Sequence, residues 1–245
     1  MAQTETAAPP AQAGLGSALA DLYFAPREAF QALLARRGFW IPLVALIALN
    51  LTFTAIWMQN VDAREFMRMQ IEDSGRADRM TPEQMQAVLD GQTGMFPVFA
   101  WMGQLVFVPL FFLALAGVYL FVFRFLLGGE VGYRASLAVL GWSFLAVAVI
   151  TTPLILLVMT LKGDWNVDPR LALQASPALF LEKASTPAWL YALADSLDLF
   201  SFWVMALLAA GYGVANRRTT RWAVGGVVGL WVVYVIGKVA LAAIF

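Results

Sequence analysis

The chain has 245 residues, of which 61% are hydrophobic and only 13% charged, and its mean hydropathy of +0.73 is too high for an ordinary water-soluble domain. Its 16 basic and 16 acidic residues balance, so it lacks the positive charge that nucleic-acid binding requires. Because it contains no cysteine and no histidine, disulfides, thiolate catalysis, histidine general bases and the common zinc and haem sites are excluded, and we expect no cofactor.

The N-terminal segment divides by composition into two parts. Residues 1–20 are rich in Ala, Pro, Gln and Gly and lack the basic start and apolar core of a secretory signal peptide, which predicts a disordered tail. Residues 21–38 place Phe30 and Leu33 on one helical face after a helix start at Pro26, with basic residues elsewhere. This pattern predicts a short cytoplasmic interfacial helix whose arginines meet lipid head groups.

Five apolar runs are long enough to cross about 30 Å of hydrocarbon as helices, which takes about 20 residues. They cover residues 39–59, 96–124, 135–161, 188–213 and 222–245. The sequence therefore predicts an all-α integral membrane protein, a bundle of five transmembrane helices that occupies residues 39–245. Its two longer connections are outer loops at about residues 60–95 and 162–187.

The first outer loop contains a full set of helix boundary signals. Thr81 suits an N-cap, and Pro82 suits the first helical position. Gln84 suits the third position of a capping box, and Gly91 suits the end of the helix. We expect a short helix that rests on the outer membrane surface or on the bundle.

Arginine and lysine residues near the ends of the spans indicate the orientation. Eight lie in short segments on the N-terminal side of the membrane, where few acids accompany them. Seven lie in the two outer loops, where they are diluted by ten acids. The denser positive charge predicts a cytoplasmic N-terminus, and five crossings place the C-terminus outside.

Two acids, Asp195 and Asp198, interrupt the fourth apolar run, and Lys238 interrupts the fifth. On one continuous helix the two acids share a face. Asp198 and Lys238 each lie 20 residues from the turn at Arg218, which predicts that they sit at the same depth on antiparallel helices. Such charges cost about 2.5 to 3.5 kcal/mol each in hydrocarbon, so they have a reason to be there. Two interpretations remain: a salt bridge that fixes helix pairing, or a proton or cation relay with Lys238 as counter-ion.

Small and polar residues mark further helix contacts. Gly225 and Gly229 form a small-xxx-small pair on the last span, which favours close helix packing within the molecule or in a dimer. Asn50 and Gln104 are single amides within the first and second spans, and they suit interhelical hydrogen bonds.

Two stretches resemble the Yip family, the Ypt/Rab-interacting membrane proteins, in its bacterial branch. "LADLYFAPREAF" running into "FWIPLVALI" is similar to the family's cytoplasmic lead-in, with Tyr23, Pro26 and Phe30 as the motif-like residues. "LLGGEVGYRASLAVLGWSF" is similar to the segment after the second span. The resemblance implies a five-span helical bundle with a cytoplasmic N-terminus, in the inner membrane of a bacterium.

The same resemblance implies a role in protein contacts, because eukaryotic members act in vesicle traffic by binding Rab-type GTPases and one another. Those relatives carry an Asp-Leu-Tyr-Gly-Pro motif. Here Phe24 and Ala25 stand between Tyr23 and Pro26, so the glycine is absent and one residue is inserted. We therefore do not transfer GTPase binding to this chain.

Taken together, these features predict a non-enzymatic scaffold or interaction protein of the cytoplasmic membrane. Its expected partners are the lipid bilayer and a membrane protein or a second copy of itself, with no nucleic acid. The alternative is a small proton- or ion-coupled transporter that uses Asp195, Asp198 and Lys238. Five spans do not divide into two equal inverted halves, which disfavours the alternative. An intramembrane aspartyl protease needs two acids on different helices, whereas these lie on one predicted helix.

Overall fold

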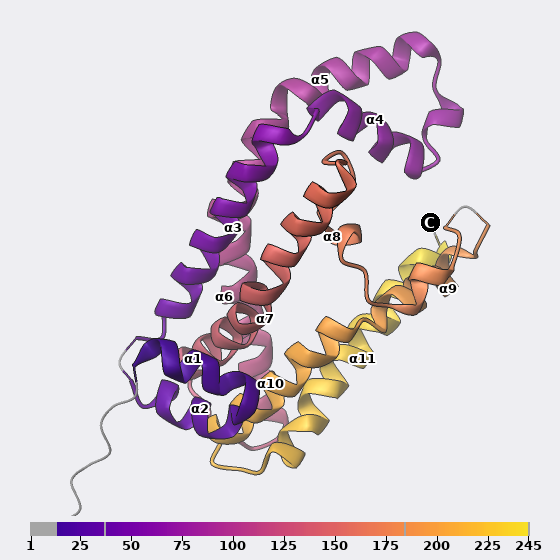
Figure 1. The fold of residues 1–245 in the computed structure, drawn as a ribbon. Helices are drawn as coiled ribbons and strands as arrows, with labels where there is room; N and C mark the ends of the chain where they lie inside the picture. Colours follow the sequence, from indigo (N-terminus) through magenta and orange to yellow (C-terminus); the bar gives the residue numbers. More distant parts are fainter. Residues whose placement is uncertain (1–13, 37, 184, 245) are drawn as a thin grey trace, which may run out of the picture.

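The computed structural model describes residues 14–36, 38–183 and 185–244, and within these ranges it contains helices and no strand. Figure 1 shows their arrangement. In chain order the helices are α1 (Leu15–Phe24), α2 (Pro26–Leu34), α3 (Ile41–Asn60), α4 (Ala63–Asp73), η1 (Ala77–Arg79), α5 (Pro82–Met102), η2 (Gly103–Phe107), α6 (Val108–Leu120), η3 (Phe121–Leu126), α7 (Tyr133–Lys162), α8 (Pro169–Ala172), η4 (Pro177–Phe180), α9 (Ala188–Ser196), α10 (Leu199–Ala215) and α11 (Thr220–Ile244). The segments η1 and η4 are short 3₁₀ helices, and η2 and η3 are π-helical turns.

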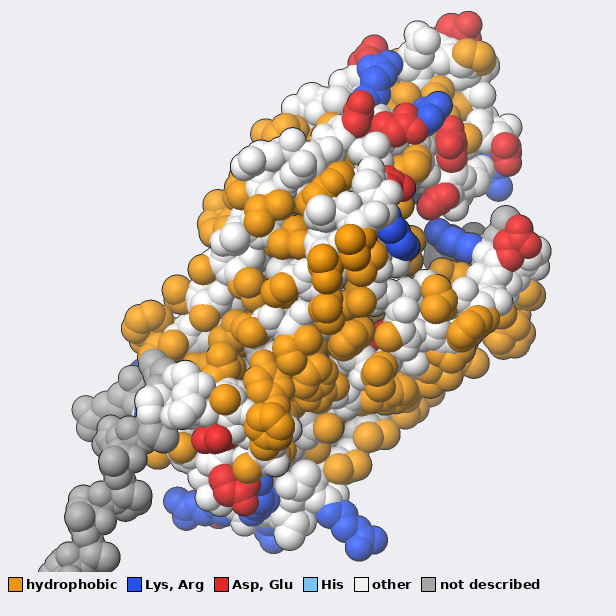
Figure 2. Space-filling model, viewed as in Figure 1, with side chains coloured by type: hydrophobic (Ala, Val, Ile, Leu, Met, Phe, Trp, Pro, Cys, Tyr) orange, Lys and Arg blue, Asp and Glu red, His pale blue; other side chains and the backbone are white. Residues whose placement is uncertain are grey.

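Four helices are long and apolar enough to cross a membrane, namely Ile41–Asn60, Pro82–Leu126, Tyr133–Lys162 and Thr220–Ile244. The pair α9 and α10 meets the same criteria jointly but is bent by 49°, so the described residues hold four spans, or five when that pair counts as one. Charged side chains gather toward the two ends of the molecule, and hydrophobic ones cover the middle (Figure 2). The predicted all-α membrane fold is confirmed.

The second span is part of a much longer helix. Pro82–Leu126 is continuous over 45 residues, which at 1.5 Å per residue is about twice the thickness of the hydrocarbon. The capping box of Thr81 and Gln84 is confirmed, but the helix does not end at Gly91. It continues because Phe96 is buried against Trp57 of α3, with ring centroids 5.5 Å apart. The paired α4 and α5 therefore project beyond the end of α7 (Figure 1).

The N-terminal segment forms two helices that pack on the bundle. Residues 1–13 of the predicted tail lie outside the described residues, but residues 15–20 belong to α1, contrary to the expected disorder. The reason is burial, since Ala18 and Leu22 are each 1% exposed within the hydrophobic core. The second helix starts at Pro26, as predicted. Its apolar face is buried against α7 and α10, and the guanidinium of Arg27 donates to the carbonyl of Arg218 in the α10–α11 turn.

Aromatic rings fill the half of the bundle near these two helices. The ring of Tyr212 stacks against those of Tyr119 and Phe123, at centroid distances of 5.1 and 4.4 Å. The Ser136 hydroxyl donates to the carbonyl of Ala116, which leaves its oxygen to accept from the Tyr212 hydroxyl at 2.6 Å. The buried hydroxyls of Ser136 and Tyr212 therefore both have hydrogen-bond partners.

The turn between η3 and α7 explains the paired glycines of "LLGGEVGYR". Gly128 has a φ of +63°, a left-handed conformation that glycine adopts without strain. A Cβ on Gly129 would lie 2.1 Å from Oδ1 of Asn216. That buried amide accepts from the Val131 N–H at 3.0 Å and donates to the Tyr212 carbonyl at 2.8 Å. The Asn216 side chain therefore connects this turn to the end of α10 by hydrogen bonds.

Candidate functional site at the break in the fourth span

The fourth span breaks between α9 and α10. The backbone of Asp198 is extended, and its carboxylate accepts from the Ser201 N–H at 2.9 Å as the N-cap of α10. Beyond the break, the Leu199 N–H donates to the carbonyl of Ala175 in the preceding loop. Polar side chains that compete for backbone groups favour such an interruption, and Ser196 bonds back to the Ala192 carbonyl on the other side of it. Hydrogen bonds therefore satisfy the N–H groups of Leu199 and Ser201 next to the break.

An ion pair joins the helix before this break, α9, to the last helix, α11. The Lys238 ammonium lies 2.7 Å from Oδ2 of Asp195, at the end of α9. The amide of Gln174 approaches the other carboxylate oxygen at 3.5 Å. The side chains are 37% and 29% exposed for Asp195 and Lys238, so both keep partial contact with the surroundings. The pair therefore links α9, α11 and the outer loop.

A second ion pair lies beside the first, in the outer loop. The Arg170 guanidinium donates through Nε to both carboxylate oxygens of Asp168, at 3.0 and 3.1 Å. Burial raises the pKa of Asp168, but hydrogen bonds from the side chain and backbone of Arg170 and the charges of Arg170 and Lys183 outweigh it and hold this pKa below its ordinary value. The Arg170 pKa is raised mainly by the hydrogen bond to Asp168, and the charge of Asp195 contributes. The side chains of Asp168, Arg170, Asp195 and Lys238 thus alternate in sign of charge across the site.

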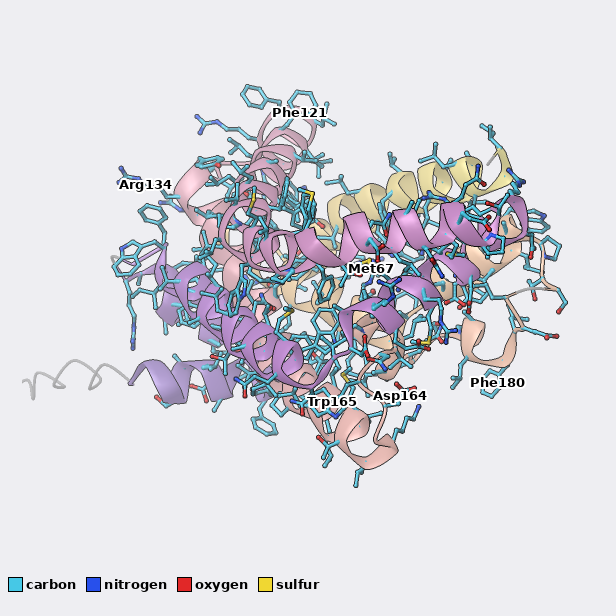
Figure 3. All side chains as sticks on the ribbon, turned by 90° about the horizontal axis from the view of Figure 1, so that it is seen from above. Met67, Phe121, Arg134, Asp164, Trp165 and Phe180 are labelled. Atoms are coloured by element: carbon cyan, nitrogen blue, oxygen red, sulfur yellow. The ribbon has the colours of Figure 1, made fainter. Side chains whose placement is uncertain are left out.

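These ion pairs border two cavities. One, of about 400 Å³, is lined by residues from α7, the outer loop, α9, α10 and α11, including Asp195, Asp198 and Lys238. The other, of about 640 Å³, lies among α3, α4, α5, α7 and α8 and includes both intramembrane amides, Asn50 and Gln104. Met67 of α4, labelled in Figure 3, lines the larger cavity. Arg170 and Ile155 line both cavities, so Arg170 stands at their boundary.

The structure separates the roles of the three predicted charged residues. We expected Asp198 to lie level with Lys238, but Lys238 pairs with Asp195. The depth count assumed one continuous helix, and the bend at residues 197–198 removes that premise. For the same reason Asp195 and Asp198 do not share a face of one helix, although both line the smaller cavity.

The two predicted packing glycines face away from the protein. A Cβ on Gly225 or Gly229 would meet no atom within 4 Å, whereas a Cβ on Gly226 would lie 2.8 Å from the Phe123 ring. The spacing of Gly225 and Gly229 left open whether they pack within the molecule or in a dimer. Within the molecule, Gly226 makes the close contact instead. Gly225 and Gly229 remain on the free side of α11. This helix lies at the edge of the bundle (Figure 1).

The motif-like residues at the N-terminus serve internal contacts. The Tyr23 hydroxyl donates to the Ala146 carbonyl of α7 at 2.7 Å. Phe30 is completely buried, with its ring 3.1 Å from the position of a Cβ on Gly211. Pro26 occupies the first turn of α2. A partner that approaches this end therefore meets other side chains first, among them Phe24, which is 88% exposed.

Asp168, Arg170 and Gln174 contribute to the site but were not singled out from the sequence. The sequence does contain a signal for Asp168, because "DPR" places an acid that suits an N-cap before a proline. In the structure, Asp168 caps α8 by accepting a hydrogen bond from the Arg170 N–H. The sequence gives no comparable signal that the loop folds back beside α9. Among the described residues, no group of three or more acids is arranged to hold a metal ion.

Apolar spanning helices around partly buried ion pairs define an integral membrane protein of the all-α class. The chain matches the family model of the Yip1 domain over residues 20–241, and it belongs to this family. The predicted membership in the Yip family is thus confirmed. Neither a curated protein nor a solved structure matches the chain.

Proposed function

We propose that this protein works without catalysis, as an interaction protein of the cytoplasmic membrane, and that the free face of α11 is its contact surface. One observation carries the proposal: Gly225 and Gly229 leave a shallow strip on a spanning helix that no part of the described protein fills. Exposed Val232 and Ile236 continue this strip along the helix. Without a hydrophobic driving force between helices in lipid, small residues promote association by letting backbones approach.

Other glycines of the same protein support this interpretation. Gly141 faces Pro42 of α3, and Gly226 faces the Phe123 ring, each at 2.9 Å or less from the position of a Cβ. Gly141 and Gly226 therefore each admit a neighbouring element at close range. The last helix is also the least buried of the four long spans. A second copy of α11 is the simplest occupant, because a glycine strip is self-complementary across a twofold axis.

Cysteine crosslinking tests this contact, since the chain has no cysteine of its own. The variant Gly229→Cys is oxidised in native membranes and analysed for a disulfide-linked dimer. The matched control is Val224→Cys, which is also exposed on α11 but lies about 140° away around the helix. We expect the dimer from Gly229→Cys and much less from Val224→Cys. Equal crosslinking of both variants, or of neither, would contradict the proposed contact.

A steric variant separates contact from folding. Gly229→Leu adds its side chain into open space, so the fold of one copy is retained. Two differently tagged wild-type copies should purify together from mild detergent, and two tagged copies of Gly229→Leu should not. Thermal unfolding of the purified variant checks that the fold is intact.

A second candidate function is proton- or ion-coupled transport, and one observation favours it: a broken span beside a charged cavity, as transporters use for coupling ions. The stacked rings of Tyr119, Tyr212 and Phe123 fill the other half of the bundle and weigh against a continuous path. Proton flux into liposomes, with Asp195→Asn as the inactive control, tests this function. Equal flux with wild type, Asp195→Asn and empty liposomes would exclude it.

A further inference from the structure

A third cavity lies at the opposite end of the bundle from the candidate site. Its volume is about 590 Å³, and it lies between the α2–α3 connection and the first turns of α7. This volume is within the range of about 300 to 1,000 Å³ that is typical of ligand sites. Its lining residues are Leu33, Leu34, Arg36, Gly38, Phe39, Trp40, Arg134, Ala135 and Ala138. Of these described residues, two are cationic and none is acidic.

The cationic side chains come from two separate elements. Arg36 follows α2, whereas Arg134 lies in the first turn of α7, with its guanidinium carbon 5.4 Å from the centroid of the Phe39 ring. Stacking on an aromatic face orients a guanidinium and leaves its N–H edge able to donate. Figure 3 shows Arg134 at the rim of the protein, pointing away from the helices. Two arginines at one cavity match the charge and the hydrogen-bonding geometry of a phosphate group.

The rest of the lining fits a lipid rather than a soluble anion. Leu33, Leu34 and Ala138 give the cavity apolar walls. Trp40, which is 55% exposed, stands directly before the spanning helix α3, in the position that tryptophan favours at the boundary between membrane and water. The cavity therefore offers charge for a head group and apolar surface for the glycerol and upper acyl chain.

We propose that this cavity binds the phosphate head group of an anionic phospholipid in the leaflet that borders the basic end of the molecule. Basic pockets between transmembrane helices bind such head groups through the same chemistry. A zwitterionic lipid brings a second, positive group toward the two arginines, so it binds more weakly. This site is separate from the α11 contact and from the charged cavity at the break.

Native mass spectrometry of the purified protein tests the proposal, with phosphatidylglycerol and phosphatidylcholine as the lipid probes. We expect the wild type to retain phosphatidylglycerol preferentially. Arg134→Gln should weaken that binding about fivefold, as the loss of one arginine near a head group predicts. The matched control is Arg221→Gln, which removes an exposed arginine that does not line the cavity and should leave the affinity unchanged.

Each alternative has a distinct outcome. Equal loss with Arg221→Gln would assign the effect to general surface charge and overturn the site. Full displacement of the lipid by millimolar glycerol 3-phosphate would assign the cavity to a soluble phosphate and overturn the lipid assignment. Unchanged phosphatidylglycerol binding by Arg134→Gln would also overturn the proposed lipid site. Should Arg134→Gln unfold, Arg36→Gln replaces it, with the same expected loss and thermal unfolding as the check on folding.

Discussion

The ammonium of Lys238 lies 2.7 Å from the carboxylate of Asp195 and joins the last helix to the short helix before the break. The neighbouring Asp198 lines the same cavity but caps α10. Two acids three residues apart thus have different structural roles. One links separate helices by charge, and the other starts a helix.

A double-mutant cycle on Asp195 and Lys238 measures this link. We expect Asp195→Asn and Lys238→Met each to lower the thermal stability in nanodiscs, because each leaves one partly buried charge without its partner. The double variant should recover part of the loss, with a coupling free energy of about 1 kcal/mol. The pair is about one-third exposed, so a larger coupling is not expected. Strictly additive losses would show that the contact does not stabilise the fold.

The cap role of Asp198 predicts a different pattern at that position. Asp198→Asn should be almost neutral for stability, because asparagine caps a helix about as well as aspartate. Asp198→Ala should cost about 1 kcal/mol, since the Ser201 N–H loses its acceptor. Thermal unfolding of the two variants under one condition compares them. If Asp198→Asn were as damaging as Asp198→Ala, the charge rather than the cap would be the important property.

The helical content and the spans were accessible from the sequence because they depend on local composition. Apolar runs of spanning length and the signals at Thr81 and Gln84 act over a few residues, and both predictions are confirmed. The end at Gly91 was wrong because a glycine without a left-handed turn does not stop a helix. The burial of Phe96 against α3, a contact distant in sequence, favours continuation.

The site was less accessible because it depends on how elements meet. The spacing of Gly225 and Gly229 indicates close packing, but it does not say whether the neighbour belongs to the same molecule. The position of Phe123 decides that Gly226 makes the internal contact. In the same way, the prediction that Asp198 lies level with Lys238 assumed a straight fourth span. The span breaks after α9, and Lys238 pairs with Asp195 instead.

Gly129 and Gly117 allow a matched test of how tightly glycines are packed, because one has close neighbours and the other has none. Gly129→Ala would place its Cβ within 2.1 Å of the Asn216 amide oxygen and 2.7 Å of the Phe123 carbonyl, so we expect a loss of about 1 to 3 kcal/mol. Gly117→Ala meets open space within α6 and should be neutral or slightly stabilising. Thermal unfolding compares them. Equal stability of the two variants would show that the Gly129 turn has room to adjust.

The Asp168–Arg170 pair predicts how stability depends on acid. The pKa of Asp168 is held below its ordinary value of 3.8, so the folded state binds fewer protons than the unfolded state near that pH. This contribution is fully present above the unfolded pKa and is lost as the pH falls through the folded pKa. We therefore expect the wild type to be more stable than Asp168→Asn at pH 6, with a smaller difference at pH 3. Thermal unfolding at the two pH values measures both differences, and an equal difference at both would contradict the lowered pKa.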